Sequence, residues 1–138
     1  ENFYLDEFVH PSIYNKYKEH SIWFLDHRIV SIAQQLRTDL ERSITINNWA
    51  AGGQRKYSGL RPFNTTLGAK MSQHKFGRAI DPMVNGLTPA EVGKFINDNE
   101  AKYMGIGLTT IEKTMFTPTW THLDCRLTAK TELFYVNG

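Results

Sequence analysis

Histidine and aspartate residues are the first feature of this sequence that could do chemistry. The segment SQHKFGRAIDP holds His74 and Asp81 seven residues apart, with Gly77 between them. On a helix the two would lie roughly 10.5 Å apart along the axis, and on one extended strand about 23 Å apart on opposite faces. Glycine is the residue least penalised at positive φ, so a chain reversal at Gly77 lets the two side chains converge. A zinc ion is a reason to converge, because its ligands lie about 2.0–2.2 Å from the metal. The alternative is a hairpin with an incidental surface histidine.

A second candidate ligand lies in the segment TPTWTHLDCR. We predict a strand here, in which His122 shares one face with Trp120 and Asp124, because side chains alternate with period two. A lone histidine on a strand is more often a satisfied or solvent-facing residue. Two histidines and an aspartate, however, are typical of hydrolytic zinc sites that leave the fourth position to water. The other histidines are weaker candidates: His10, His20 and His27.

Length and composition predict one soluble globular domain over residues 1–138. The chain is 41% hydrophobic and carries a net charge of only +2, which gives no electrostatic footprint for nucleic-acid binding. A single cysteine, Cys125, allows no internal disulfide. The segment ENFYLDEF shows no basic region followed by an apolar run, so no secretion signal is visible. No apolar stretch approaches the ~20 residues that span a bilayer, and we expect no membrane span.

The elements that must position these residues follow from hydrophobic spacing. Apolar residues at helical spacing predict a short helix after Pro11 and a long one over residues 21–40, with Ser21 as a possible N-cap. Ile44 and Ile46 alternate with polar residues, as in a half-buried strand. Residues 50–71 carry four glycines and a proline, which predicts a long loop of the kind that carries function.

The second half of the chain contains one more predicted helix and several predicted strands. In LTPAEVGKFINDN, Thr88 is the expected N-cap, Pro89 the first helical residue and Glu91 the partner that completes a capping box. KYMGIGLTT, KTMF, WTHLDCRL and ELFYV are predicted short strands. The expected fold is therefore α+β, with an antiparallel sheet, helices packed on one side of it and a zinc site at the sheet.

The sequence resembles a family of zinc peptidases. SQHKFGRAID has the form Ser-x-His-x-x-Gly-x-Ala-x-Asp, and WTHLD follows about forty residues later. Together they resemble the zinc peptidases of the D-alanyl-D-alanine carboxypeptidase type, which include D-Ala-D-Ala dipeptidases, phage cell-wall endopeptidases and the metal-binding domain of hedgehog proteins. YSGLRPFN is similar to the Ser-Gly-x-Arg segment of that family, and FYLDEFVHP to the N-terminal helix of some bacterial and phage members.

The resemblance implies roles for particular residues. It implies His74, Asp81 and His122 as the zinc ligands, Ser72 as a contact to the substrate peptide, and Arg61 as the group that binds the substrate carboxylate or the polarised carbonyl. Two neutral imidazoles and one carboxylate leave a Zn²⁺ site with net charge +1, which suits the activation of water. The planar fork of an arginine can bind both oxygens of a carboxylate.

The general base departs from the family pattern. Several members place Glu or Asp three residues before the last histidine ligand, where this chain has Thr119; others place His two residues before it, where this chain has Trp120. We expect Trp120 to take part in substrate binding. Asp124 is the nearest carboxylate in sequence. We expect it to orient His122 rather than to accept a proton in catalysis. Glu112 is the other candidate.

The resemblance implies a zinc-dependent peptidase that hydrolyses stem or cross-link peptides of bacterial peptidoglycan, as a carboxypeptidase or an endopeptidase. A phage product of the endolysin kind, acting at the cell wall, fits the same pattern. The alternative from another class is a metal-binding recognition or virion structural module that keeps the fold and the zinc without turnover, as Thr119 hints. A third alternative is a metal-free structural domain with a coincidental motif.

Overall fold

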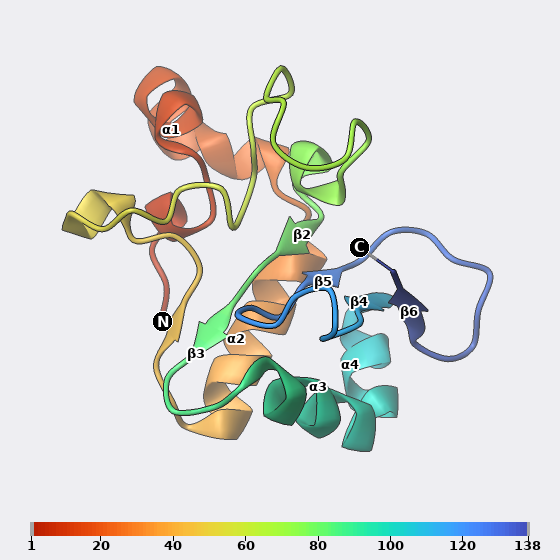
Figure 1. Cartoon of the computed structure of the whole chain (residues 1–138). Helices are drawn as coiled ribbons and strands as arrows, with labels where there is room; N and C mark the ends of the chain where they lie inside the picture. The colour runs from red at the N-terminus through yellow and green to blue at the C-terminus, as the bar shows by residue number, and fades with distance from the viewer. Residues whose placement is uncertain (1, 138) are drawn as a thin grey trace.

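A computed structural model describes residues 2–137 of the chain. Its helices and strands form an α+β arrangement (Figure 1). The helices are α1 (Pro11–Tyr17), α2 (His27–Leu40), α3 (Pro89–Asp98) and α4 (Glu100–Ile106). The strands are β1 (Ile44–Thr45), β2 (Ala79–Ile80), β3 (Met83–Val84), β4 (Thr110–Glu112), β5 (Leu123–Asp124) and β6 (Phe134–Val136).

The strands form a small sheet of β1 and β3 and a larger sheet in the order β2-β5-β4-β6. β5 pairs antiparallel with both β2 and β4, as predicted, whereas β6 pairs parallel to β4. The larger sheet is therefore mixed, and the prediction of a purely antiparallel sheet is wrong at this edge. Residues 113–122 connect β4 to β5, and residues 125–133 connect β5 to β6. The second connection brings the chain back along β4 in the same direction.

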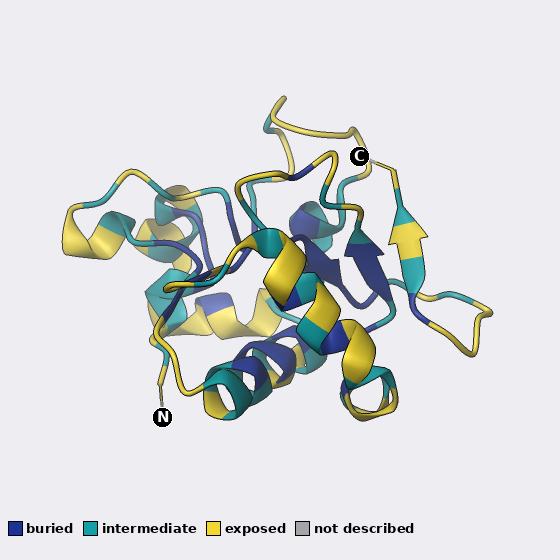
Figure 2. Ribbon diagram, turned by 60° about the horizontal axis from the view of Figure 1, so that its bottom comes forward, coloured by how far each residue is buried: buried dark blue, intermediate teal, exposed yellow. Residues whose placement is uncertain are grey.

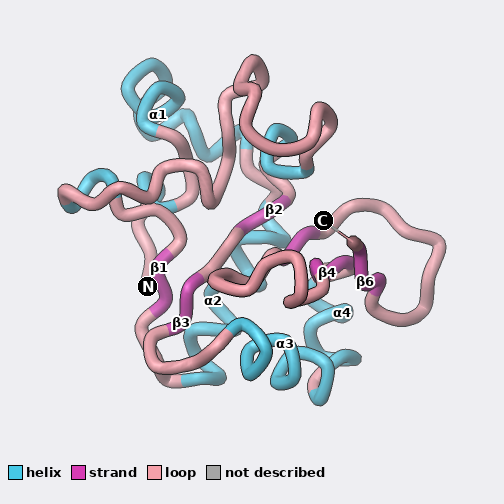
Figure 3. The backbone as a smooth tube through the Cα atoms, viewed as in Figure 1, coloured by secondary structure: helices cyan, strands magenta, loops and turns pink. Residues whose placement is uncertain are grey.

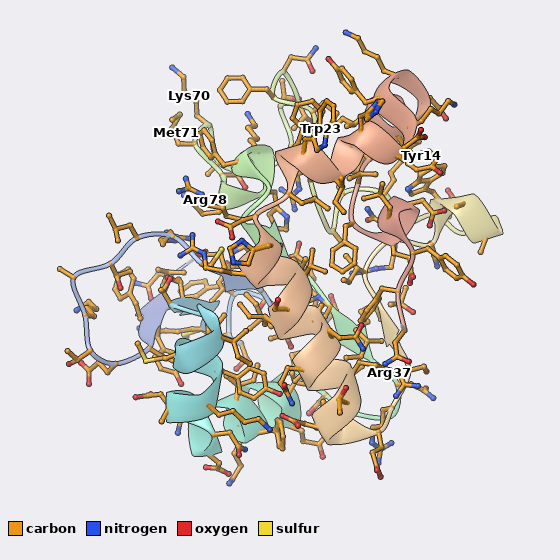
Figure 4. All side chains as sticks on the ribbon, turned by 180° about the vertical axis from the view of Figure 1, so that it is seen from behind. Tyr14, Trp23, Arg37, Lys70, Met71 and Arg78 are labelled. Carbon is orange, nitrogen blue, oxygen red and sulfur yellow. The ribbon has the colours of Figure 1, made fainter. Side chains whose placement is uncertain are left out.

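Helix α2 lies against one face of the larger sheet. It passes behind β2 and β5 in Figure 1 and in front of them in the reverse view of Figure 4. Ile80, Ile111 and Leu123 belong to one buried apolar cluster that also contains residues of α2, α3 and α4. The strands at the centre of the larger sheet are buried, whereas the helices expose their outer surfaces (Figure 2). Because side chains alternate along a strand, the neighbours of these apolar residues face the opposite side of the sheet.

The long helix begins later than its hydrophobic spacing predicts. Ser21 is buried in a 3-10 helix over Lys18–Phe24, and Leu25 is extended, so Ser21 is not the N-cap. Asp26 caps α2 instead, because its side chain accepts a hydrogen bond from the backbone N–H of Arg28. A short acidic side chain satisfies an otherwise unpaired N–H of the first turn and fixes the start of the helix there.

In the second half the helix α3 is confirmed in detail and two predicted strands are wrong. Thr88 and Glu91 form the predicted capping box, and Pro89 is the first helical residue. Residues 102–106 of the predicted strand KYMGIGLTT belong instead to α4, which buries Tyr103 against the core. Residues 113–116, KTMF, form a turn closed by a hydrogen bond from the Phe116 N–H to the Lys113 carbonyl.

The predicted loop over residues 50–71 is confirmed as an irregular excursion (Figure 3). It is anchored where Leu60 pairs with Val9 through an isolated parallel bridge. Gly59, next to Leu60, passes so close to the N-terminal segment that an added Cβ would lie 2.2 Å from the carbonyl oxygen of Phe8. A glycine therefore permits the backbone contact that fixes this loop beside the sheet.

Within residues 2–137, no helix combines the length and the apolar character needed to cross a membrane.

Candidate metal centre

His74 is placed by a short 3-10 helix, Gln73–Phe76, that ends at Gly77. Gly77 has φ +69°, which confirms the predicted reversal at this residue. The reversed turn is held from outside, because the backbone N–H of Asp26 donates to the Gly77 carbonyl over 2.9 Å. The imidazole of His74 is thereby buried against the end of β2.

Asp81 and His122 meet at the end of the β2–β5 pair. Ile80 pairs with Leu123, so one step further along the register Asp81 lies opposite His122. The backbone of Asp81 is fixed on both sides, since its N–H donates to the Ser58 carbonyl over 2.8 Å and its carbonyl accepts from Arg55 over 2.7 Å. The aspartate is therefore held next to the histidine by backbone contacts as well as by its side chain.

The three side chains converge on one point. His74 Nε2 lies 3.1 Å from Asp81 Oδ1 and 3.2 Å from His122 Nδ1, and that Nδ1 lies 2.8 Å from the same Oδ1. All three residues are buried, and one ligand atom from each falls within 4.8 Å of the others. A buried group of two histidines and one aspartate with this spacing could hold a metal ion.

The outer nitrogen of each histidine fixes which atom faces the centre. His74 Nδ1 lies 2.9 Å from the Gly59 carbonyl oxygen, which can only accept, so Nδ1 carries the proton. His122 Nε2 lies 3.0 Å from Asp124 Oδ2, and an ionised carboxylate likewise requires a donor. In their neutral forms both rings therefore present a lone pair to the centre, beside a carboxylate oxygen. Three acceptor atoms at these distances need a cation between them.

The charges of the group agree with this requirement. Burial lowers the pKa of His74, against the pull of Asp81. For His122, burial opposes the charged form, but hydrogen bonds to Asp124 and Asp81 outweigh it and raise the pKa to about 9. Burial also opposes the charge of Asp81, yet the two histidines hold its pKa well below the usual range. Without a metal, one proton on His122 Nδ1 thus occupies the place between the three acceptors.

Arg61 lies beside the metal group. Its Nη2 donates to Asp81 Oδ2 over 3.2 Å, and its Nε donates to the Tyr57 carbonyl over 2.6 Å. Burial lowers the pKa of Arg61, against the effect of Asp81. The arginine therefore binds the second oxygen of a proposed ligand, a contact that the sequence did not reveal. Its predicted role in binding the substrate stays a prediction.

Asp124 lies behind His122, away from the centre. It is fully buried, and both of its oxygens are bound: Oδ2 to His122, and both to the guanidinium of Arg126. Burial opposes its charge, but the bonds from His122 and Arg126 lower its pKa. This geometry is consistent with the orienting role predicted for Asp124. The contact with Arg126 was not predicted from the sequence.

A pocket of about 440 Å³ opens onto the metal group. Ser72 and Trp120 line it together with Arg61, which places all three predicted substrate-binding residues around one cavity. Thr119 is exposed and is not among the lining residues. Glu112, the other candidate for the general base, does line the pocket. The register of β4 against β5, which sequence spacing does not reveal, brings it there.

The other histidines lie apart from the centre. His10 Nδ1 accepts from the Ser12 N–H and so caps α1, while His20 packs against the ring of Trp23. His27 is the exposed first residue of α2. Comparison of the chain with protein-family models, with curated proteins and with solved structures found no match.

Proposed function

We propose that this chain is a zinc-dependent peptidase that hydrolyses stem or cross-link peptides of bacterial peptidoglycan. The observation that carries the proposal is the convergence of His74 Nε2, Asp81 Oδ1 and His122 Nδ1 in the lining of a pocket. Two imidazole nitrogens and one carboxylate oxygen would suit Zn²⁺, and the adjoining pocket has room for water or a substrate group. The cell-wall substrate and a phage origin rest on the resemblance of the two sequence motifs.

Zinc, when bound, supplies a Lewis acid that polarises a peptide carbonyl and activates water. The residues of the chain provide the rest of the site. Arg61 keeps Asp81 in place through Nη2, while its Nη1 has no hydrogen-bond partner among residues 2–137 and remains for a substrate carboxylate or carbonyl. Ser72 and Trp120, on the pocket wall, offer a hydroxyl and an aromatic face to a peptide. Such fixed contacts position the scissile bond and so lower the entropic part of the barrier.

The test is release of new amines from peptidoglycan and from isolated stem peptides by the purified, zinc-loaded protein. Arg61→Ala should suppress this release, whereas Arg37→Ala, in the last turn of α2 (Figure 4), should leave it unchanged. Because Arg61 also touches Asp81, zinc content must be measured on the same samples. A loss of release with zinc retained assigns Arg61 to the substrate, and a loss of both assigns it to the metal group.

One observation favours a second candidate function. Where several members of the resembled family carry an acidic residue as general base, this chain has Thr119, which is exposed and lies outside the pocket. A metal-binding recognition or virion structural module without turnover fits that departure. No amine release from walls of several peptide chemistries, with zinc verified in the protein, would favour this module over the peptidase.

A further inference from the structure

A carboxylate that is not a ligand lies beside the metal group. On β4, Thr110 pairs with Asp124 and Ile111 pairs with Leu123 of β5. One step further along this register, Glu112 lies opposite His122. The Glu112 N–H donates to the His122 carbonyl over 3.2 Å, which confirms that pairing. Directly opposed residues have Cβ atoms about 4.5–5.5 Å apart and point to the same face of the sheet.

Asp81, His122 and Glu112 therefore form a row across the ends of three strands. Asp81, the residue after β2, flanks His122 on one side, and Glu112, the last residue of β4, flanks it on the other. The alternate residues Ile80, Leu123 and Ile111 face the core. The row faces the pocket, since all three of its members line that cavity. The metal group thus has a ligand carboxylate on one side of His122 and a second carboxylate on the other.

Glu112 differs from the other carboxylates near the site, because its charge interacts with the guanidinium of Arg126 only at long range. Asp81 shares its oxygens between two histidines and Arg61, and Asp124 is fully buried behind His122 with both oxygens bound. The Glu112 carboxylate makes no hydrogen bond or ion pair with any side chain among residues 2–137, and it is partly exposed. It is therefore free to exchange a proton with a molecule in the pocket.

We propose that Glu112 is the general base and then the general acid of the peptidase, a role that rests on the proposed function. Its carboxylate takes one proton from the attacking water as the water oxygen bonds to the scissile carbonyl carbon. The C–N bond then breaks, and the same proton passes from Glu112 to the leaving amine nitrogen. The acyl carbon keeps the hydroxyl as a new carboxylic acid, and Glu112 returns to its starting state. Glu112 would thus supply the carboxylate that Thr119 does not provide.

The variants Glu112→Gln and Glu112→Asp test this role, with Glu132→Gln as a matched control on an exposed residue outside the pocket. Zinc content should be one per chain in all of them. Turnover by E112Q should fall by about 10²–10⁴-fold in kcat at little-changed KM, the usual range for loss of a general base. E112D keeps a carboxylate and should retain more turnover than E112Q, and E132Q should match the wild type.

A binding measurement gives a readout independent of turnover. Acetohydroxamic acid is titrated calorimetrically into the zinc-loaded proteins. Its hydroxyl can donate a hydrogen bond to a carboxylate beside the metal. Loss of that charged acceptor should weaken hydroxamate binding to E112Q by about 10–100-fold, with E132Q unchanged.

The outcomes separate the two proposals. Unchanged hydroxamate binding by E112Q, or loss of zinc from it, overturns the placement of Glu112 whether or not the wild type is active. Amine release by E112Q at the wild-type rate overturns its catalytic role and leaves the peptidase standing. A zinc-loaded wild type that releases no amine overturns the proposed function and the catalytic role together.

Discussion

Replacing Gly77 with alanine should damage the fold and the metal group together. Gly77 has φ +69°, and the Cβ of an alanine there would lie 1.9 Å from the carbonyl oxygen of Phe24 and 3.1 Å from the Cα of Leu25. These are backbone atoms at the junction before α2, so no side-chain rotation relieves the contact. Either the turn that carries His74 or the chain entering α2 must move.

The size of the effect follows from two contributions. A residue with a Cβ in the left-handed region loses about 1–2 kcal/mol, and crowding a packed region costs about 1–3 kcal/mol more. The free energy of unfolding should therefore fall by roughly 2–5 kcal/mol, a large share of the about 5–15 kcal/mol of a typical domain. Displacement of His74 should also weaken zinc binding, by about 10–100-fold if it resembles the loss of a group that orients a ligand.

Gly52 offers a matched control. It has φ +88°, but nothing lies within 4 Å of a Cβ added there. Gly52→Ala should lose only the conformational contribution, about 1–2 kcal/mol, and should keep its zinc affinity. The assay is urea unfolding of the metal-free proteins, followed by zinc competition with a chelator. Equal losses of stability in the two variants, or unchanged zinc affinity in Gly77→Ala, would show that the contact with Phe24 does not restrict this turn.

Two further predictions concern the surroundings of His122. Asp124→Asn should weaken zinc binding by about 10–100-fold, because the amide orients the His122 ring less well than the carboxylate does. Activity at saturating zinc should then largely recover. Turnover that stays low with zinc bound would make Asp124 a proton acceptor instead. The raised pKa of His122, about 9, means that zinc must displace a proton at pH 7, so zinc affinity should rise with pH up to about 9. Calorimetry at pH 7 in buffers of different ionisation enthalpy should report about one proton released per zinc, and a binding enthalpy independent of the buffer would contradict this.

Local signals in the sequence predicted the parts of the fold that local chemistry decides. The capping box of Thr88 and Glu91 specified where α3 begins, and Gly77 specified a reversal, because each depends on residues close in the chain. The predicted start of α2 is wrong. The hydrophobic spacing extends back to Ile22, but the N-cap at Asp26 makes His27 the first residue of the helix. Ile22 is exposed, so its helical spacing did not report on packing.

The metal group shows the same limit. Residue type and spacing made His74, Asp81 and His122 candidates, and the family resemblance implied them as the ligand set; the structure brings the three side chains together. The contacts around them depend on chain segments far apart in sequence. Arg61 reaches Asp81 from the long loop, and Glu112 faces the pocket only because of the register between β4 and β5. Sequence spacing fixes which residues share a face of one strand, but it does not fix which strand lies beside it.

Zinc content of the purified protein decides whether His74, Asp81 and His122 form a metal site. We expect close to one zinc per chain by elemental analysis of protein prepared without chelator. His74→Ala and His122→Ala should bring that value near zero, because each removes one of three ligands from a buried group. His27→Ala, at an exposed position on α2, should retain the full amount. Equal zinc content in all four proteins, or none in the wild type after incubation with zinc, would contradict the assignment of this site.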